Sequence, residues 1–159
     1  MSLQYVIDGY NIINNNSFRS DLNKFKDCRI ALLEIIRLNK LTGSTNNEVI
    51  AVFDGYPPYP DFHYDYSNFK VIFSCDVSAD QRIKDILEAS LNPKNIVVVS
   101  DDKEVRFFAS GCRAKIESVV DFLGRAKNTA VNSKEIRETI LTYTEVRDIN
   151  EELKKKWLK

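Results

Sequence analysis

The sequence of 159 residues has little of what several kinds of site require. It holds one histidine, His63, and three cysteines, and the cysteines show no CxxC or Cys/His spacing. Zinc sites, disulfide frameworks and His-dependent nucleophilic catalysis are therefore disfavoured, and a reducing cytoplasm is the expected compartment. The glycine-rich phosphate loops GxxxxGK[ST] and GxGxxG are also missing, which argues against an NTPase or a dinucleotide enzyme.

The chain has no excess of charge, because 23 Lys and Arg balance 23 Asp and Glu. Bulk attraction therefore cannot supply affinity for nucleic acid, and any basic surface must be local. No run approaches the roughly 18 apolar residues of a membrane span, and no basic region precedes the first apolar run. We accordingly expect neither a membrane protein nor a secreted one.

Short apolar runs rich in Val, Ile and Phe alternate along the chain with helical periodicity. The runs predict strands at 4–7, 49–53, 70–73 and 95–99, with a weaker one at 113–116. Ser78 with Gln81, and Asp101 with Glu104, predict two helix N-termini by the capping-box pattern. This order of elements predicts an α/β fold of three layers with a mainly parallel central sheet.

The length predicts one domain over residues 1–159. From residue 132 onward the pattern is purely helical, so 132–159 is expected to be a C-terminal helical extension packed on the domain. Its end is basic and amphipathic. A helix with solvated lysines is the simpler interpretation, and a contact with RNA or a partner is the alternative.

Acidic residues follow the predicted strands. Asp8 ends the first, Asp54 ends the second, Asp80 follows the third, and Asp101 and Asp102 follow the fourth. Each alone could be a turn or a helix cap, but the carboxyl ends of parallel strands meet at one edge. Clustered carboxylates repel one another unless a cation neutralises them, and Mg²⁺ or Mn²⁺ is the natural occupant of an oxygen site. Such a site suits hydrolysis of phosphodiesters by metal-activated water.

Three segments carry a resemblance to a known family: IDGYN at 7–11, ADQRI at 79–83 and SDDKEV at 100–105. With them, the chain resembles the YacP-like NYN-domain proteins of the PIN-like nuclease superfamily over about residues 3–125. The resemblance implies a Rossmann-like PIN/NYN fold and an endoribonuclease that depends on Mg²⁺ or Mn²⁺. It also implies RNA, in particular mRNA, as the substrate, with the translation machinery as a candidate partner.

The resemblance assigns roles to individual residues. Asp8, Asp80 and Asp102 are the expected catalytic residues and metal ligands, and Asn11 and Ser100 are expected to support them. In the family register Asp101 replaces a small polar residue; as acids that follow strands, Asp101 is added to the expected metal set and Asp54 to the supporting set. Gln81 departs from the family pattern, since relatives usually carry Glu there. A catalytically inactive NYN domain that binds RNA or protein remains the alternative, and the oligomeric state stays open.

The segment 54–69 is too long and too aromatic for a simple turn. Its rings either cover the sheet edge or stack with unpaired bases, and Tyr59 and Tyr64 are the expected RNA contacts. Arg82 and Arg106 are the expected phosphate contacts, with Arg113 as a further candidate. A receiver-type phosphoacceptor is disfavoured, because Lys115 lies inside the weak fifth strand instead of at its end.

Overall fold

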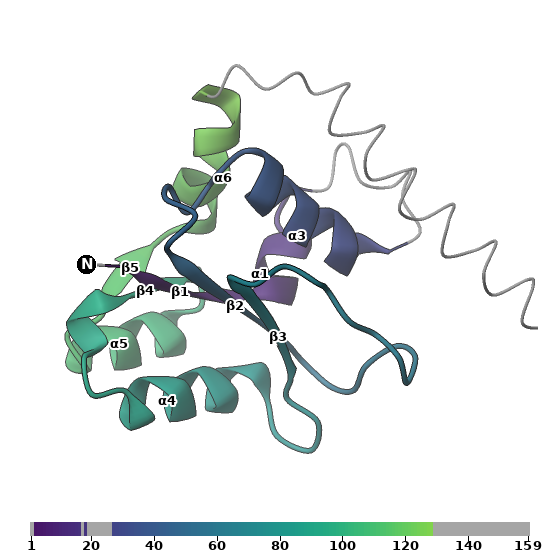
Figure 1. Ribbon diagram of the computed structural model, residues 1–159. Coiled ribbons are helices and arrows are strands. Elements are labelled where there is room, and N and C mark those ends of the chain that lie inside the picture. Colours follow the sequence, from purple (N-terminus) through teal and green to yellow (C-terminus); the bar gives the residue numbers. More distant parts are fainter. Residues whose placement is uncertain (1, 17, 19–26, 129–159) are drawn as a thin grey trace, which may run out of the picture.

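The computed structural model describes residues 2–16, 18 and 27–128. In this part of the chain the centre is a five-stranded sheet, in which all neighbours run parallel in the order β3-β2-β1-β4-β5 (Figure 1). The strands are β1 (Gln4–Asp8), β2 (Glu48–Phe53), β3 (Phe69–Phe73), β4 (Ile96–Val99) and β5 (Lys115–Glu117). The predicted α/β class is confirmed, and each strand begins and ends within two residues of its predicted bounds.

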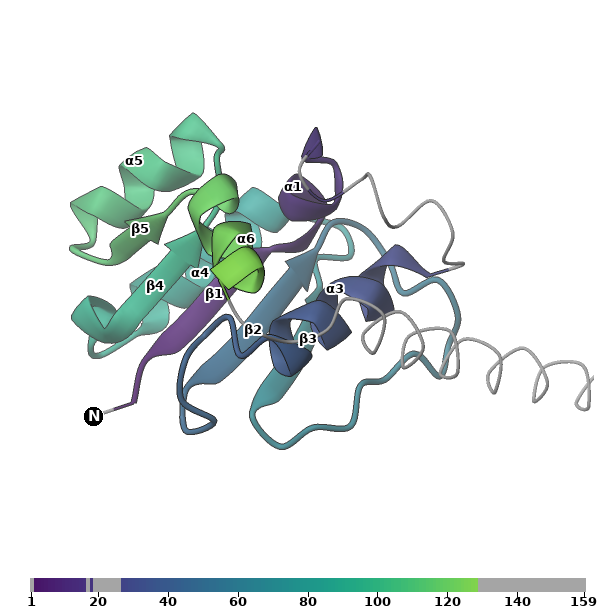
Figure 2. The same ribbon diagram turned by 90° about the horizontal axis from the view of Figure 1, so that it is seen from above.

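Helices cover both faces of the sheet (Figures 1 and 2). The helices are α1 (Gly9–Ile13), α3 (Cys28–Leu38), α4 (Ala79–Ala89), α5 (Lys103–Gly111) and α6 (Val119–Asn128), with a 3₁₀ turn η1 (Pro93–Asn95) before β4. Helices α4 and α5 pack on one face, and α1, α3 and α6 lie on the other. The three-layer arrangement is therefore confirmed.

The strands have few polar positions because the sheet is buried on both sides. Alternate residues point to opposite faces: Val6 and Val98 join the core under α4 and α5, while Ile7 and Val99 join the core under α1, α3 and α6. All four side chains are fully buried or nearly so. Two cores, one on each face, thus fix the strand register and with it the positions of the strand ends.

The order of the strands reverses between β1 and β4. From β1 the chain continues to β2 and β3 on one side, and α4 then returns it to β4 on the other side. In open α/β sheets, ligands bind outside the carboxyl ends of the strands at such a switch point. Asp8 at the end of β1 and Ser100 after β4 lie on the two sides of this switch.

Gly9 allows α1 to begin directly after β1. A Cβ built at this position would lie 2.3 Å from Cε1 of Phe53, closer than side chains tolerate, so the backbone of α1 approaches the end of β2 only because position 9 is glycine. This explains the glycine in the IDGYN segment by packing alone.

The predicted C-terminal helical extension, 132–159, lies outside the described residues, so its packing on the domain stays a prediction. Within the described ranges, no helix has the length and apolar character needed to cross a membrane.

Candidate metal centre

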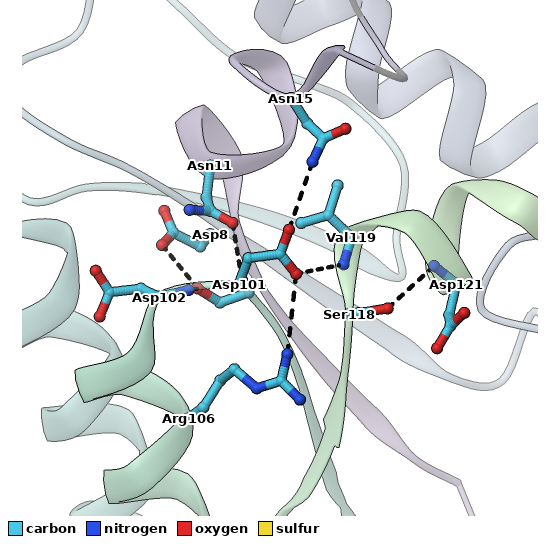
Figure 3. A network of polar contacts seen from close by, with 10 residues as sticks. Asp8, Asn11, Asn15, Asp101, Asp102, Arg106, Ser118, Val119 and Asp121 are labelled. Atoms are coloured by element: carbon cyan, nitrogen blue, oxygen red, sulfur yellow. Dashed lines mark hydrogen bonds and ion pairs between the residues drawn. The ribbon is translucent and has the colours of Figure 1, made fainter.

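Asp8 is a buried carboxylate at the carboxyl end of the central strand. Its side chain is only 7% exposed, and its Oδ2 accepts a hydrogen bond from the Ser100 hydroxyl at 3.2 Å (Figure 3). Burial, and then the neighbouring charges of Asp80 and Asp102, raise the pKa of Asp8 to about 6, against a lowering by the bond from Ser100. Asp8 therefore lies within electrostatic reach of the two other predicted ligands.

Asp102 caps helix α5. Its Oδ1 accepts hydrogen bonds from the backbone N–H groups of Glu104 at 2.9 Å and Val105 at 3.1 Å. The capping-box prediction for Asp101 with Glu104 is wrong, because the helix begins one residue later and Asp102 is its N-cap. Since Oδ1 makes both capping bonds, Oδ2 of Asp102 is available for a cation.

Asp80 lies in the first turn of helix α4, and two residues cap that helix. Ser78 accepts from the N–H of Gln81 at 3.1 Å, as predicted, while Oδ1 of Asp54 accepts from the N–H of Ala79 at 3.1 Å. The end of β2 is thereby tied to the start of α4. Asp54 therefore contacts the residue that directly precedes Asp80.

Three carboxylates converge where α4 and α5 begin. Asp80, Asp102 and Glu104 each offer an oxygen, and these oxygens all lie within 4.8 Å of one another. Hard divalent cations bind oxygens at about 2.0–2.6 Å, so oxygens bound to one ion are separated by up to about 5 Å. The trio therefore fits a hard divalent cation, with Asp8 beside it.

Burial, and then the charges of Asp102 and Glu104, raise the pKa of Asp80, while the ammonium of Lys84 lowers it. This shift is typical of a carboxylate that is partly buried beside other carboxylates. Glu104 was not predicted as a ligand. It falls two positions after Asp102 in the first turn of α5, but the sequence pattern suggested a capping role for it instead.

Asp101 is used differently from its neighbour. Its Oδ1 accepts from the N–H of Val119, the first residue of α6, at 3.0 Å, and its Oδ2 accepts from Asn15 at 3.4 Å (Figure 3). Its own N–H donates to Oδ1 of Asn11 at 2.9 Å. Asp101 thus connects the end of β4 to α1 and to the start of α6, and it lies outside the converging trio. Asn11 contributes to this connection through its bond to the N–H of Asp101.

Ser100 links the two halves of the site. It is fully buried, and its Oγ accepts from the N–H of Asp102 at 3.1 Å while its hydroxyl donates to Asp8. The hydroxyl therefore links the end of β4 to the end of β1.

The predicted arginines lie on the two helices of the site. Arg106 on α5 is partly exposed, with Nη1 3.9 Å from Oδ1 of Asp101. Arg82 on α4 is partly buried, and its Nε has no hydrogen-bond partner among the described residues.

The aromatic rings of the 54–69 segment differ in their surroundings. Tyr64 is 8% exposed and donates to the buried Glu34 of α3 at 2.8 Å, so the structure places it in the core. Tyr59 is partly buried against Phe62, with ring centroids 5.4 Å apart. Tyr56 is 61% exposed, and its hydroxyl bonds to Asp76 on the loop before α4. Tyr56 is thus the most exposed tyrosine of this segment.

Comparison with known proteins agrees with this architecture. A family model described as the YacP-like NYN domain matches residues 5–159. The crystal structure of Rae1 (YacP) from Bacillus subtilis has a TM-score of 0.62 at 22% identity, covering 99% of this chain and 92% of that one. The structure of its W164L mutant has a TM-score of 0.59 at 24% identity, covering 96% and 86%. At these identities the likeness concerns the fold. No curated protein matches the chain significantly.

Proposed function

The chain belongs to the YacP-like NYN-domain family, a family of PIN-like nucleases, and on this premise we propose that it is a divalent-metal-dependent endoribonuclease. One observation carries the proposal: the oxygens of Asp80, Asp102 and Glu104 lie within 4.8 Å of one another beside the buried Asp8. Acidic residues gathered at this edge of a parallel sheet repel one another, and a bound cation offsets that repulsion.

Mg²⁺ or Mn²⁺ is the proposed occupant. The donor set consists of carboxylate oxygens, without histidine or thiolate, and this favours hard ions over zinc. When bound, such an ion supplies an activated water molecule and stabilises negative charge on the phosphodiester. Asp8, Asp80 and Asp102 are the proposed ligands, and Glu104 is a neighbouring carboxylate that is paired with Lys84 in the metal-free protein.

Hydrogen bonds within the protein hold the carboxylates of this site in place before substrate binds. Asp54 caps the first turn of α4, which carries Asp80, Asp102 is held in place as the N-cap of α5, and Ser100 bonds to Asp8. Because Asp80 and Asp102 raise the pKa of Asp8, neutralising them with a cation would lower that pKa and keep Asp8 ionised at neutral pH. Preorganisation of this kind is what transition-state stabilisation by fixed charges requires.

The proposed substrate is RNA, and mRNA in a cytoplasmic setting with the translation machinery is the context that the family resemblance suggests. Tyr56 is the proposed ring for base stacking, because the residue is 61% exposed while its hydroxyl bonds to Asp76. Tyr59 is a second candidate ring. Arg106 and Arg82 are the proposed phosphate contacts. Tyr64 is left out of this set because it is buried.

Incubation with end-labelled single-stranded RNA tests the proposal. We expect internal cleavage in Mg²⁺ or Mn²⁺, none in EDTA, and recovery when the metal is restored. Asp80→Asn should abolish cleavage while far-UV circular dichroism stays unchanged, and Asp85→Asn, an exposed acid one turn further along α4, serves as the matched control.

RNA binding that survives in EDTA without cleavage under any metal would instead support the alternative, an inactive domain that binds RNA. Cleavage by the metal-free protein, or by Asp80→Asn at the wild-type rate, would contradict the metal mechanism.

A further inference from the structure

A lysine lies among the carboxylates of the candidate metal centre. Lys84 is one helical turn after Asp80 on α4, and its Nζ donates to Oε1 of Glu104 at 2.7 Å. The lysine side chain is only 19% exposed, while that of Glu104 is 70% exposed. The ammonium group is therefore held inward, against the acidic cluster.

The contacts of Lys84 join two helices. Its Nζ lies 5.7 Å from the centroid of the Phe108 ring, within the range of a cation–π contact, and Phe108 is one turn after Glu104 on α5. Helices α4 and α5 lie side by side on the same face of the sheet (Figures 1 and 2). Lys84 thus connects the two helices at whose N-terminal ends Asp80 and Asp102 lie.

The directions of the pKa shifts around Lys84 agree with this placement of its ammonium group. Its bond to Glu104, followed by the neighbouring charges of Asp80 and Asp102, raises the pKa of its ammonium group. In return, Lys84 lowers the pKa of Asp80, whereas the surrounding carboxylates raise it. In the metal-free protein the ammonium group therefore supplies part of the positive charge that the carboxylates require.

We propose that Lys84 is a positioning residue of the metal centre, which holds and neutralises Glu104 and so keeps this carboxylate from completing the site around a divalent ion. The inference rests on the proposed function, since it concerns the same site. Its consequence is a centre that binds a first ion through the aspartates and resists a second, because the fourth carboxylate is already paired with a fixed cation.

Titration of the whole protein with Mn²⁺ tests this inference, with free Mn²⁺ followed by electron paramagnetic resonance. Lys84→Met keeps the apolar stem beside Phe108 and removes the charge. We expect it to bind Mn²⁺ about tenfold more tightly than the wild type, or to bind a second ion, because Glu104 is released. Lys84→Arg preserves the charge and should remain near the wild-type affinity. Lys94→Met, the same change in η1 at the opposite end of the sheet, should also have no effect.

A double-mutant cycle with Glu104→Gln decides whether Lys84 acts through Glu104. In the Glu104→Gln background, Lys84→Met should lose most of its effect on Mn²⁺ affinity. An equal gain in both backgrounds would overturn the inference by showing that Lys84 acts on the ion as bulk charge. An unchanged affinity in Lys84→Met would overturn it as well.

The wild-type protein separates this inference from the proposed function. A wild type that binds Mn²⁺ and cleaves RNA while the cycle shows no coupling rejects the role of Lys84 alone. A wild type that binds no Mn²⁺ rejects the metal-dependent function itself. Melting temperatures without metal provide the fold control for every variant.

Discussion

The hydroxyl of Ser100 donates to Oδ2 of Asp8 at 3.2 Å and joins the ends of β4 and β1, two strands separated by most of the described chain. The same oxygen atom of Ser100 accepts from the N–H of Asp102. One buried hydroxyl therefore positions two candidate ligands, and it is the main hydrogen-bond contribution that opposes the rise in the pKa of Asp8.

The metal-free protein should lose stability as the pH rises from about 4 to about 6. The pKa of Asp8 is about 6 in the folded state and 3.8 in the reference state, so the folded protein binds the proton more tightly over this interval. The free energy of unfolding should fall by roughly 3 kcal/mol from this group alone. Asp8→Asn should remove this part of the slope, as measured by urea unfolding in EDTA. Parallel pH profiles for the wild type and Asp8→Asn would contradict the shift.

The two roles proposed for Asp102, helix cap and metal ligand, should respond differently to substitution. Asparagine is also a good N-cap, so Asp102→Asn should keep the melting temperature without metal and abolish both cleavage and Mn²⁺ binding by the cluster. Asp102→Ala should lose both functions and about 1 kcal/mol of stability. Calorimetry in EDTA and Mn²⁺ titration measure the two effects independently. Retained cleavage in Asp102→Asn would exclude it as a ligand.

Substitution of Asp101 should lower stability and leave metal binding nearly unchanged. Its carboxylate braces the start of α6, so Asp101→Ala should lower the free energy of unfolding by about 1 kcal/mol, with and without metal. The Mn²⁺ affinity should stay within about twofold of the wild type. A large loss of affinity at unchanged stability would instead return Asp101 to the set of metal ligands.

Tyr56 and Tyr64 should differ in their effects on RNA binding and stability. In Ca²⁺, chosen to allow binding without cleavage, Tyr56→Ala should weaken single-stranded RNA binding several-fold at constant melting temperature, because base stacking is worth roughly 1–3 kcal/mol. Tyr64→Phe leaves Oε1 of the buried Glu34 without its donor, although Arg37 still donates to Oε2, so it should cost about 1–3 kcal/mol of stability and leave RNA affinity unchanged. The reverse pattern would place the RNA path on Tyr64.

The fold could be predicted from local patterns. Apolar runs such as Val49 to Phe53 are buried on both faces of the sheet, and a continuous apolar run of this length predicts a strand of a covered parallel sheet. Ser78 caps α4 at the position that the capping pattern predicted. The convergence of Asp80 and Asp102 followed from the same reasoning, because parallel strands bring the loops after them to one edge.

Which acidic residue caps a helix and which faces the candidate metal centre could not be predicted in this way. Asp101 and Asp102 are adjacent and chemically identical, and only the position of α6 decides that Asp101 meets the N–H of Val119 while Asp102 turns toward Asp80. The sequence suggested a cap at Asp101 because the spacing to Glu104 satisfied the pattern, but a one-residue shift in the helix start changes which side chain is the cap.

Two further assignments depended on contacts between distant residues. Tyr64 is a core residue because Glu34 of α3 is buried beneath it, and Glu104 faces Lys84 because α4 and α5 pack together. The sequence by itself determined the fold class and the edge of the sheet where the site lies, since burial and periodicity are local properties. The tertiary structure decided which carboxylates share a cation and which of them meet a helix or a lysine, because these roles depend on distances between residues far apart in the chain.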